Sequence, residues 1–404
     1  MEAGMVWVGV DVGRYSHALC AIDASGSVIW ERKRVLNTTW AMRRVLAKLL
    51  HFLRGRPVHF AVEEPNGNAT ALLRLLAADG LPVFLAQPLR VYRFHLALGQ
   101  PHKSDPYDAQ VIAQFARQNA SKLPPVRILT PTTQSLRVLS RRADAVGKDM
   151  RRCVSRLRGV LAEYAPEWLA CRVFRDWSSA AALGTLERYG CISKLQRTRV
   201  SRLGRALSKW TQGRYGETHA RTLIEAFSEV VLPSQVEQAY HQVICSLVKQ
   251  IRALVAERRH LLSLIRAQGE SLPAMAEVQS EFGYGPELSA IIVSEVGDMA
   301  DFPSEAGFAT YCGVTPVKRK SGVSRGSSRL SRFTNKRLLR AVTQAARTAA
   351  THEPESRTYY QRKLAGRSDP HAKTLALIAL ARHRTRRLYK LLRRVSTQPE
   401  ELVA

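Results

Sequence analysis

Two short apolar segments near the N-terminus each end in acidic residues, and this pattern restricts the folds open to the chain. Met5–Asp11 reads MVWVGVD and Val58–Glu64 reads VHFAVEE. Short runs of branched apolar residues are typical of buried strands. In an open α/β sheet the ligand site lies at the carboxyl ends of the strands. We therefore expect the acids that end these two segments to face a common site.

The segments around these two strands predict the rest of an α/β domain. Turn residues, above all glycine, separate the next apolar runs, so the first three strands form an antiparallel meander. Strands are predicted at 5–11, 18–23, 28–34, 58–64 and 81–86, and helices at 40–53, 67–78 and 103–119. This order, with acids at two strand ends, describes an RNase H-like α/β domain over residues 1–125.

A pair of aspartates opens the last of these helices. Asp105 and Asp108 are three residues apart, so they share one helical face. One interpretation is structural: Asp105 caps the helix, Pro106 is its first residue and Asp108 complements the helix dipole. That interpretation does not account for Asp11 and Glu64, which end strands rather than begin helices.

Four carboxylates from separate segments suit a metal site for phosphoryl transfer. Oxygen ligands of this kind hold Mg²⁺, which neutralises phosphate charge and activates an oxygen nucleophile. The predicted ligands are Asp11, Glu64, Asp105 and Asp108. They converge only if the first domain has the RNase H-like arrangement.

The charge of the chain indicates a nucleic-acid partner. The 404 residues carry a formal net charge of +29, with a pI near 10.6. Residues 1–125 hold 15 Lys and Arg against 9 Asp and Glu, a net of +6, which leaves +23 for residues 126–404. We expect this second part to provide most of the binding to a polyanion, including a structured RNA.

The cysteines and the N-terminus bear on location. None of the six cysteines forms a Cys-x-x-Cys pair, which argues against a zinc ribbon and fits reduced thiols. The N-terminus has no basic region ahead of its apolar run, so a signal peptide is not expected. A cytoplasmic location, associated with the bacterial nucleoid, is predicted.

The middle of the chain is predicted to form a helical arm. Pro-rich residues 122–131 mark a boundary, and long helices are expected over 132–164 and 234–268. They flank an irregular insert of basic short helices. The arm, residues 126–270, is either a coiled-coil oligomer contact or an intramolecular helical hairpin. Residues 271–404 are predicted to form a third, mainly α-helical domain.

A strongly cationic segment in the third domain contains a serine beside a glycine. No acid interrupts residues 318–340, and three cations directly precede Ser321. Ser321 is either a nucleophile aimed at a backbone phosphate or a turn residue in a phosphate-binding loop. The predicted nucleic-acid-binding residues are Lys318, Arg319, Lys320, Arg325, Arg329, Arg332, Lys336, Arg337 and Arg340.

The order of these motifs resembles one known family. The motifs are VGVDVG at 8–13, EPNG at 64–67, KSDPYDA at 103–109, YCGVTP at 311–316, SG at 321–322 and NKRLLR at 335–340. Together they resemble the DEDD-type insertion-sequence transposases, the Piv/MooV-related recombinases whose members are guided by a bridge RNA. The spacing E-x-x-G selects Glu64 over Glu63. FGYG replaces the family's usual PGIG, and Thr334 replaces the glycine before Asn335.

The resemblance implies a composite active site. RuvC-like carboxylates would bind Mg²⁺, and Ser321 would attack DNA to form a 5′-phosphoserine link. The implied partners are donor and target DNA, a bridge RNA and further copies of the chain in a dimer or tetramer.

Three other functions are consistent with parts of the sequence. The first is a RuvC-type Mg²⁺-dependent endonuclease or junction resolvase, in which water attacks and Ser321 is structural. The second is an actin-like sugar kinase, because Asp11 and Gly13 also suit a phosphate-binding hairpin. The net charge and the lack of a second phosphate loop argue against it. The third is a non-catalytic nucleic-acid-binding protein.

Overall fold

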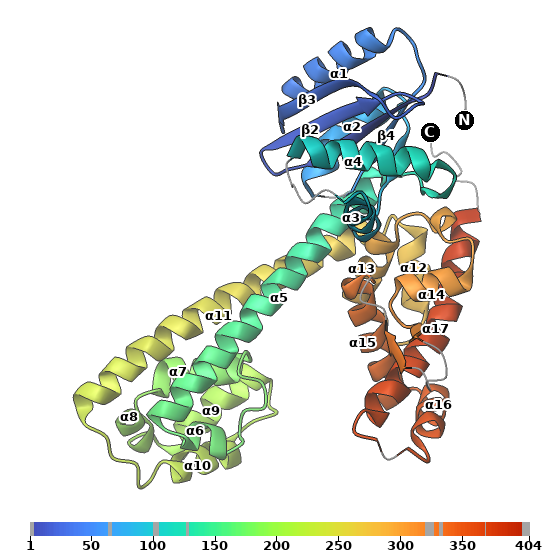
Figure 1. Cartoon of the computed structure of the whole chain (residues 1–404). Helices are drawn as coiled ribbons and strands as arrows, with labels where there is room; N and C mark the ends of the chain where they lie inside the picture. The colour runs from blue at the N-terminus through green and yellow to red at the C-terminus, as the bar shows by residue number, and fades with distance from the viewer. Residues whose placement is uncertain are drawn as a thin grey trace. The chain divides into compact units, whose positions relative to one another are not determined.

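A computed structural model describes residues 4–63, 67–99, 105–126, 129–319, 327–330, 334–367 and 369–397. Contacts within the chain group it into two compact units, Met1–Thr130 and Pro131–Ala404. Figure 1 shows both units coloured along the chain. Each is described below by itself.

A mixed sheet of five strands forms the centre of the first unit, as the sequence predicted. The strands are β1 (Val6–Val12), β2 (Ser16–Ile22), β3 (Val28–Leu36), β4 (Val58–Val62) and β5 (Val83–Leu85). They lie in the order β3-β2-β1-β4-β5. The meander β1-β2-β3 is antiparallel, whereas β4 and β5 run parallel to β1. Parallel pairing brings the ends of β1 and β4 to one edge of the sheet.

Helices cover both faces of this sheet (Figure 1). Alternate residues of β1 face opposite sides, as the period of a strand requires. Val6, Val8 and Val10 belong to the core beneath α1 (Thr39–Leu53) and α2 (Thr70–Ala78). Trp7 belongs to the core beneath α4 (Asp105–Gln118). The sequence prediction missed α3 (Pro88–Ala97), a short helix that begins at a proline and buries a single residue, Val91.

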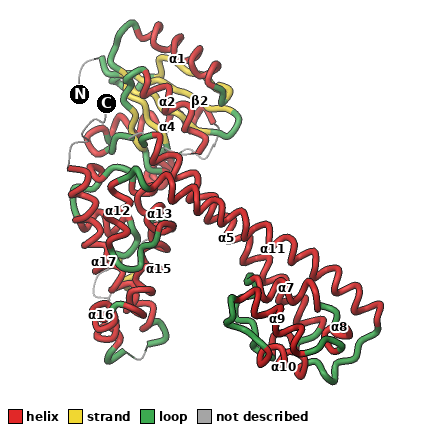
Figure 2. The backbone as a smooth tube through the Cα atoms, turned by 180° about the vertical axis from the view of Figure 1, so that it is seen from behind, coloured by secondary structure: helices red, strands yellow, loops and turns green. Residues whose placement is uncertain are grey.

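Two long helices form an arm in the second unit. Helices α5 (Pro131–Tyr164) and α11 (Ser234–Gly269) run side by side in both views (Figures 1 and 2). Five short helices pack against them around their own core: α6 (Glu167–Ala170), α7 (Ala180–Tyr189), α8 (Ile192–Gln196), α9 (Val200–Thr211) and α10 (Glu217–Ala226). Trp168 and Phe227 are fully buried in that core. The arm is thus a hairpin with a globular insert.

The rest of the second unit is a helical bundle with one small hairpin. Its helices are α12 (Pro273–Ser280), α13 (Pro286–Val296), α14 (Glu305–Tyr311), α15 (Lys336–His352), α16 (Pro354–Leu364) and α17 (Ala372–Thr397). Strand β6 (Pro316–Arg319) pairs antiparallel with β7 (Ser327–Leu330). A second apolar core joins this bundle to the start of α5 and the end of α11.

The second unit therefore has two cores, one in the arm insert and one in the bundle. The predicted three-domain division, with boundaries at residues 125 and 270, stays a prediction. Within the residues that the structure describes, no helix has the length and apolar character needed to cross a bilayer.

Candidate functional site

Asp11 lies at the carboxyl end of β1, on the face of the sheet that α4 covers. Gly9, two residues earlier on the same face, packs directly under α4, where an added Cβ would stand 2.1 Å from the Ala109 carbonyl oxygen. Side chains two residues apart in a strand point the same way. Asp11 therefore lies on the α4 side of the sheet.

The direction of α4 brings its N-terminus to the same end of β1. At the opposite end, Arg117 Nη1 donates a hydrogen bond of 3.0 Å to the Ala24 carbonyl, just beyond β2. The end of β2 pairs with the start of β1, where Ile22 lies opposite Trp7. The C-terminus of α4 is thus near the start of β1, and its N-terminus is near the end of β1.

Asp108 lies in the first turns of α4 and is partly buried. Its side chain is 23% exposed, and Oδ1 lies 3.9 Å from His95 Nδ1. Because α4 begins at that end, Asp108 lies at the end of the sheet that holds Asp11. Both residues offer hard oxygen ligands, so this part of the predicted set fits Mg²⁺.

Several predicted site residues lie outside the described residues. Glu64, Lys320, Ser321, Arg325 and Arg332 do, as do the side chains of Asp105, Lys318, Arg319 and Arg329. The side chains that are described include no cluster of three His, Cys, Asp or Glu suited to a metal. The four-carboxylate site therefore stays a prediction, supported by the placement of Asp11 and Asp108.

The hairpin β6–β7 carries the two ends of the serine segment. Arg319 pairs with Ser327, and Pro316 pairs with Leu330. The seven residues 320–326 that join the strands include Ser321. Sequence patterns did not predict this hairpin, because its strands are four residues each and mostly polar.

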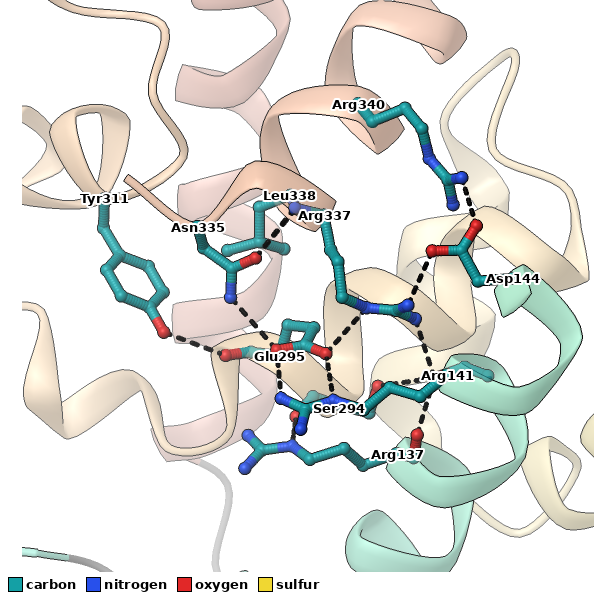
Figure 3. A network of polar contacts seen from close by, with 11 residues as sticks. Arg137, Arg141, Asp144, Ser294, Glu295, Tyr311, Asn335, Arg337, Leu338 and Arg340 are labelled. Carbon is teal, nitrogen blue, oxygen red and sulfur yellow. Dashed lines mark hydrogen bonds and ion pairs between the residues drawn. The ribbon is translucent and has the colours of Figure 1, made fainter. Parts of the chain in front are cut away.

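Within the bundle, the buried residue Glu295 contacts residues that come before and after the serine segment in the sequence (Figure 3). The side chain of Glu295, on α13, is 3% exposed. Arg141 donates two hydrogen bonds to it, of 2.9 and 3.1 Å, and Arg337 Nε lies 2.8 Å from Oε1. Asn335 Nδ2 donates a further bond of 3.0 Å, and Tyr311 Oη donates one of 3.3 Å to the Glu295 carbonyl. Glu295 thus contacts residues on both sides of the serine segment.

A second buried acid, Asp144 on α5, extends the network. Its side chain is 5% exposed, and Oδ2 accepts a hydrogen bond of 2.6 Å from Arg337 Nη1. Arg340 forms an ion pair with its other oxygen. The start of α15 is therefore held to α5 and α13 together. Asn335 also caps α15, because its Oδ1 accepts from the Arg337 and Leu338 amides.

The network changes the pKa of its members. Burial, the largest single effect, would raise the pKa of Glu295, but the hydrogen bonds from Arg141 and Asn335 and the charges of Arg141 and Arg137 together outweigh it, so its pKa lies below the ordinary value. Burial lowers the pKa of Arg337 and that of Arg137. Arg137 Nε donates a hydrogen bond of 2.7 Å to the Ser294 carbonyl oxygen. Glu295 is therefore ionised at neutral pH.

Sequence reasoning missed Glu295 and Asp144. A signal was present for Glu295, an acid inside the apolar run AIIVSEV, since a buried acid needs a partner. Arg337 and Arg340 were predicted to bind nucleic acid, and the structure gives both internal ion pairs. Lys336, beside them, is exposed. Nucleic-acid binding by all three stays a prediction.

Known proteins resemble this chain along most of its length. A family model described as "Transposase" matches residues 8–166, and a second, "Transposase IS116/IS110/IS902 family", matches residues 275–361. An "Insertion element IS116 uncharacterized 44.8 kDa protein" of Streptomyces clavuligerus is 32% identical over 96% of this chain and 94% of its own length. An IS900 protein of Mycobacterium paratuberculosis is 30% identical over 96% of each chain.

Two further matches are weaker. The "Mini-circle putative transposase for IS117" of Streptomyces coelicolor is 25% identical over 89% of this chain and 87% of its own length. The solved T. thermophilus RuvC in complex with Holliday junction substrate aligns with 30% of this chain and 99% of its own, at 21% identity and a TM-score of 0.25. A score this low supports no conclusion about the fold.

Proposed function

Since this chain belongs to the IS116/IS110/IS902 family of transposases, we propose that it cuts and rejoins DNA strands through a 5′-phosphoserine intermediate on Ser321. The observation that carries the proposal is the placement of Asp11 and Asp108 at one end of the first sheet. The strand order β3-β2-β1-β4-β5, with β1, β4 and β5 parallel, supports an RNase H-like, RuvC-like domain. Family membership also favours a transposase over a sugar kinase.

Asp11, Glu64, Asp105 and Asp108 would hold Mg²⁺ in this proposal. When bound there, the ion would neutralise phosphate charge and favour loss of the serine proton. The carboxylates would keep the ion at the end of the sheet, and His95 Nδ1, 3.9 Å from Asp108 Oδ1, would lie beside one of the ligands.

Ser321 would supply the nucleophile. Its Oγ forms a bond to phosphorus while the bond from phosphorus to the 3′ oxygen breaks, so the serine loses a proton and the leaving 3′ hydroxyl gains one. Lys318, Arg319, Lys320 and Arg325 would neutralise the charge that develops on the phosphate. The covalent link conserves the phosphodiester, so the reverse attack by a new 3′ hydroxyl rejoins the strand without ATP.

We also propose a structured guide RNA, a bridge RNA, as a partner, bound mainly by residues 126–404. The net charge of +23 in that part supports it. Assembly into a dimer or tetramer would bring the carboxylates and the serine together in cis or in trans. A cytoplasmic location on the nucleoid follows from these partners.

The alternative is a RuvC-type nuclease in which water attacks and Ser321 is structural. Trapping with denaturant separates the two functions, because only serine attack leaves DNA covalently bound to protein. Ser321→Ala should abolish the covalent adduct and strand rejoining while RNA binding is retained. Alanine variants of Ser324, Ser327 and Ser328 are matched controls with the same basic surroundings. An Ser321→Ala protein that still rejoins DNA would contradict the proposal.

A further inference from the structure

The arm insert, which is the set of short helices α6 to α10 between α5 and α11, contains a second cationic stretch. This stretch lies outside both of the family matches. Between Glu187 and Glu217 the chain has no acidic residue over residues 188–216. The same stretch holds eight cations: Arg188, Lys194, Arg197, Arg199, Arg202, Arg205, Lys209 and Arg214. It includes all of α8 and α9.

Folding places every one of these cations on the surface. Helix α9 buries Leu203, Gly204 and Leu207 against the arm core and directs its basic residues the other way. All eight cations are exposed. Over residues 188–216 the chain thus has buried apolar residues on one side and exposed charged residues that are all cationic on the other.

Some arm arginines outside this stretch have acidic partners. Arg142 pairs with Glu257 at 2.6 Å, and Arg252 pairs with Glu187 at 2.7 Å. Among the described side chains of residues 129–316, none of the eight forms an ion pair. Arg188 lies over the Trp210 ring, 5.6 Å from its centroid. A group of like charges without counter-charges is stabilised by an external anion.

A hollow of about 320 Å³ lies within this surface. Its cations are Lys194, Arg197 and Arg202, and no carboxylate lines it. The buried acid Glu237 accepts hydrogen bonds of 2.7 and 2.6 Å from the amide and hydroxyl of Ser193, one of the lining residues. The three cations therefore face the hollow without a competing acid in its wall.

The geometry points to a binding site for the phosphate backbone of a nucleic acid, which we propose for the arm basic surface: Lys194, Arg197, Arg199, Arg202, Arg205 and Lys209. Arg202, Arg205 and Lys209 lie on one helix, and Arg202 and Lys209 are seven residue steps apart, roughly 10 Å. One nucleic-acid strand carries a phosphate about every 3.4 Å along the duplex axis, so this helix face spans about three phosphates. The inference rests on the proposed function only in that the protein handles nucleic acid.

The test is the salt dependence of binding by the full chain. The variant is Arg197→Gln/Arg202→Gln/Arg205→Gln. Its matched control is Arg142→Gln/Arg152→Gln/Arg252→Gln, which removes the same charge from arm arginines that have acidic partners. Thermal unfolding checks that both proteins fold. The probes are RNA recovered with the wild-type protein and duplex DNA of random sequence.

The slope of log affinity against log salt is negative, and the first variant should make it less steep by about 2 to 3. Each phosphate contact that is lost contributes about 0.7 to 0.9 to this change. The control should leave the slope nearly unchanged. A reduction with RNA alone assigns the surface to RNA, one with DNA alone to DNA, and one with both to a general phosphate site. Equal slopes for wild type and variant with both probes overturn the inference.

The outcome is separable from that of the proposed function. If the variant binds with an unchanged slope while wild type still forms the Ser321 adduct, only the arm surface is wrong. If the slope falls but no adduct forms on Ser321, the arm surface stands and the phosphoserine mechanism is wrong.

Discussion

Arginines in α15 and in α9 look alike in the sequence but have different surroundings in the structure. Arg337 and Arg340 begin an amphipathic basic helix and pair with buried Asp144 or Glu295. Arg202 and Arg205 also lie on an amphipathic basic helix but face solvent without an acid. The difference is whether a buried carboxylate from another helix reaches the guanidinium. A count of cations therefore does not separate structural arginines from those available to a polyanion.

The largest effect is expected at the centre of the buried network. Glu295→Ala removes the buried carboxylate that pairs with both Arg141 and Arg337. Removal of one partner from a buried ion pair costs about 3–5 kcal/mol. The free energy of unfolding, measured with denaturant, should fall by that amount. Arg205→Gln is the surface control, for which a change within about 0.5 kcal/mol is expected. Equal effects of the two changes would contradict the comparison.

Arg337 and Arg202 are expected to differ most clearly in what their substitution changes: stability for Arg337 and nucleic-acid binding for Arg202. Arg337→Met leaves Asp144 and Glu295 each short of a partner, so we expect a loss of about 2–4 kcal/mol in unfolding free energy. Arg202→Gln should leave the free energy of unfolding unchanged. It should make the negative slope of log affinity against log salt less steep by about 0.9. If Arg337→Met instead makes the salt dependence of nucleic-acid binding less steep and leaves stability unchanged, Arg337 contacts nucleic acid. Its internal ion pairs then contribute little to stability.

A smaller effect is expected in the pH dependence of stability. The pKa of Glu295 is lowered in the folded state, so its stabilisation is fully present above the unfolded-state pKa, about 4.3. Stability is lost as pH falls through the folded-state pKa, because protonation removes the charge that its arginines pair with. Thermal unfolding between neutral pH and about pH 3 should show this loss in wild type. Glu295→Gln should be less stable at neutral pH and lose less on acidification.

The two acids that follow β4 in the sequence test the assignment of the metal ligands in the first domain. Glu64→Gln should abolish adduct formation with little effect on stability, because a predicted metal ligand is neutralised at nearly constant volume. Glu63→Gln changes the adjacent acid in the same way and should retain most activity. Adduct yield at fixed Mg²⁺ measures both. Loss of activity in Glu63→Gln alone would move the ligand to Glu63.

The first sheet could be predicted well because each of its strands is marked by residues within the strand itself and in the adjacent turns. Alternation and short apolar runs marked β1, β2, β3 and β4, and glycine-containing turns separated them. The hairpin β6–β7 was missed because its strands are short and polar. The buried network was missed for another reason: Arg337 and Asp144 are 193 residues apart, so neither segment shows the pairing by itself.

The site was predictable in part for similar reasons. Asp11 ends an apolar strand, and Asp108 is three residues from Asp105 at a helix start, so both are local signals. Their approach depends on the direction of α4 across the sheet, which only the structure gives. The exposed arginines of the insert had no motif, and the structure singled them out by their exposure and their lack of ion pairs among the described side chains.

The measurement that tests the central claim most directly is the identity of the residue joined to DNA. Wild-type protein is incubated with its DNA ends and Mg²⁺, denatured and digested, and the nucleotide-bearing peptide is sequenced by mass spectrometry. The account predicts a single modified residue, Ser321, linked to a 5′ phosphate. A link to Ser324, Ser327 or Ser328, or free 5′ phosphates without any adduct, would contradict it.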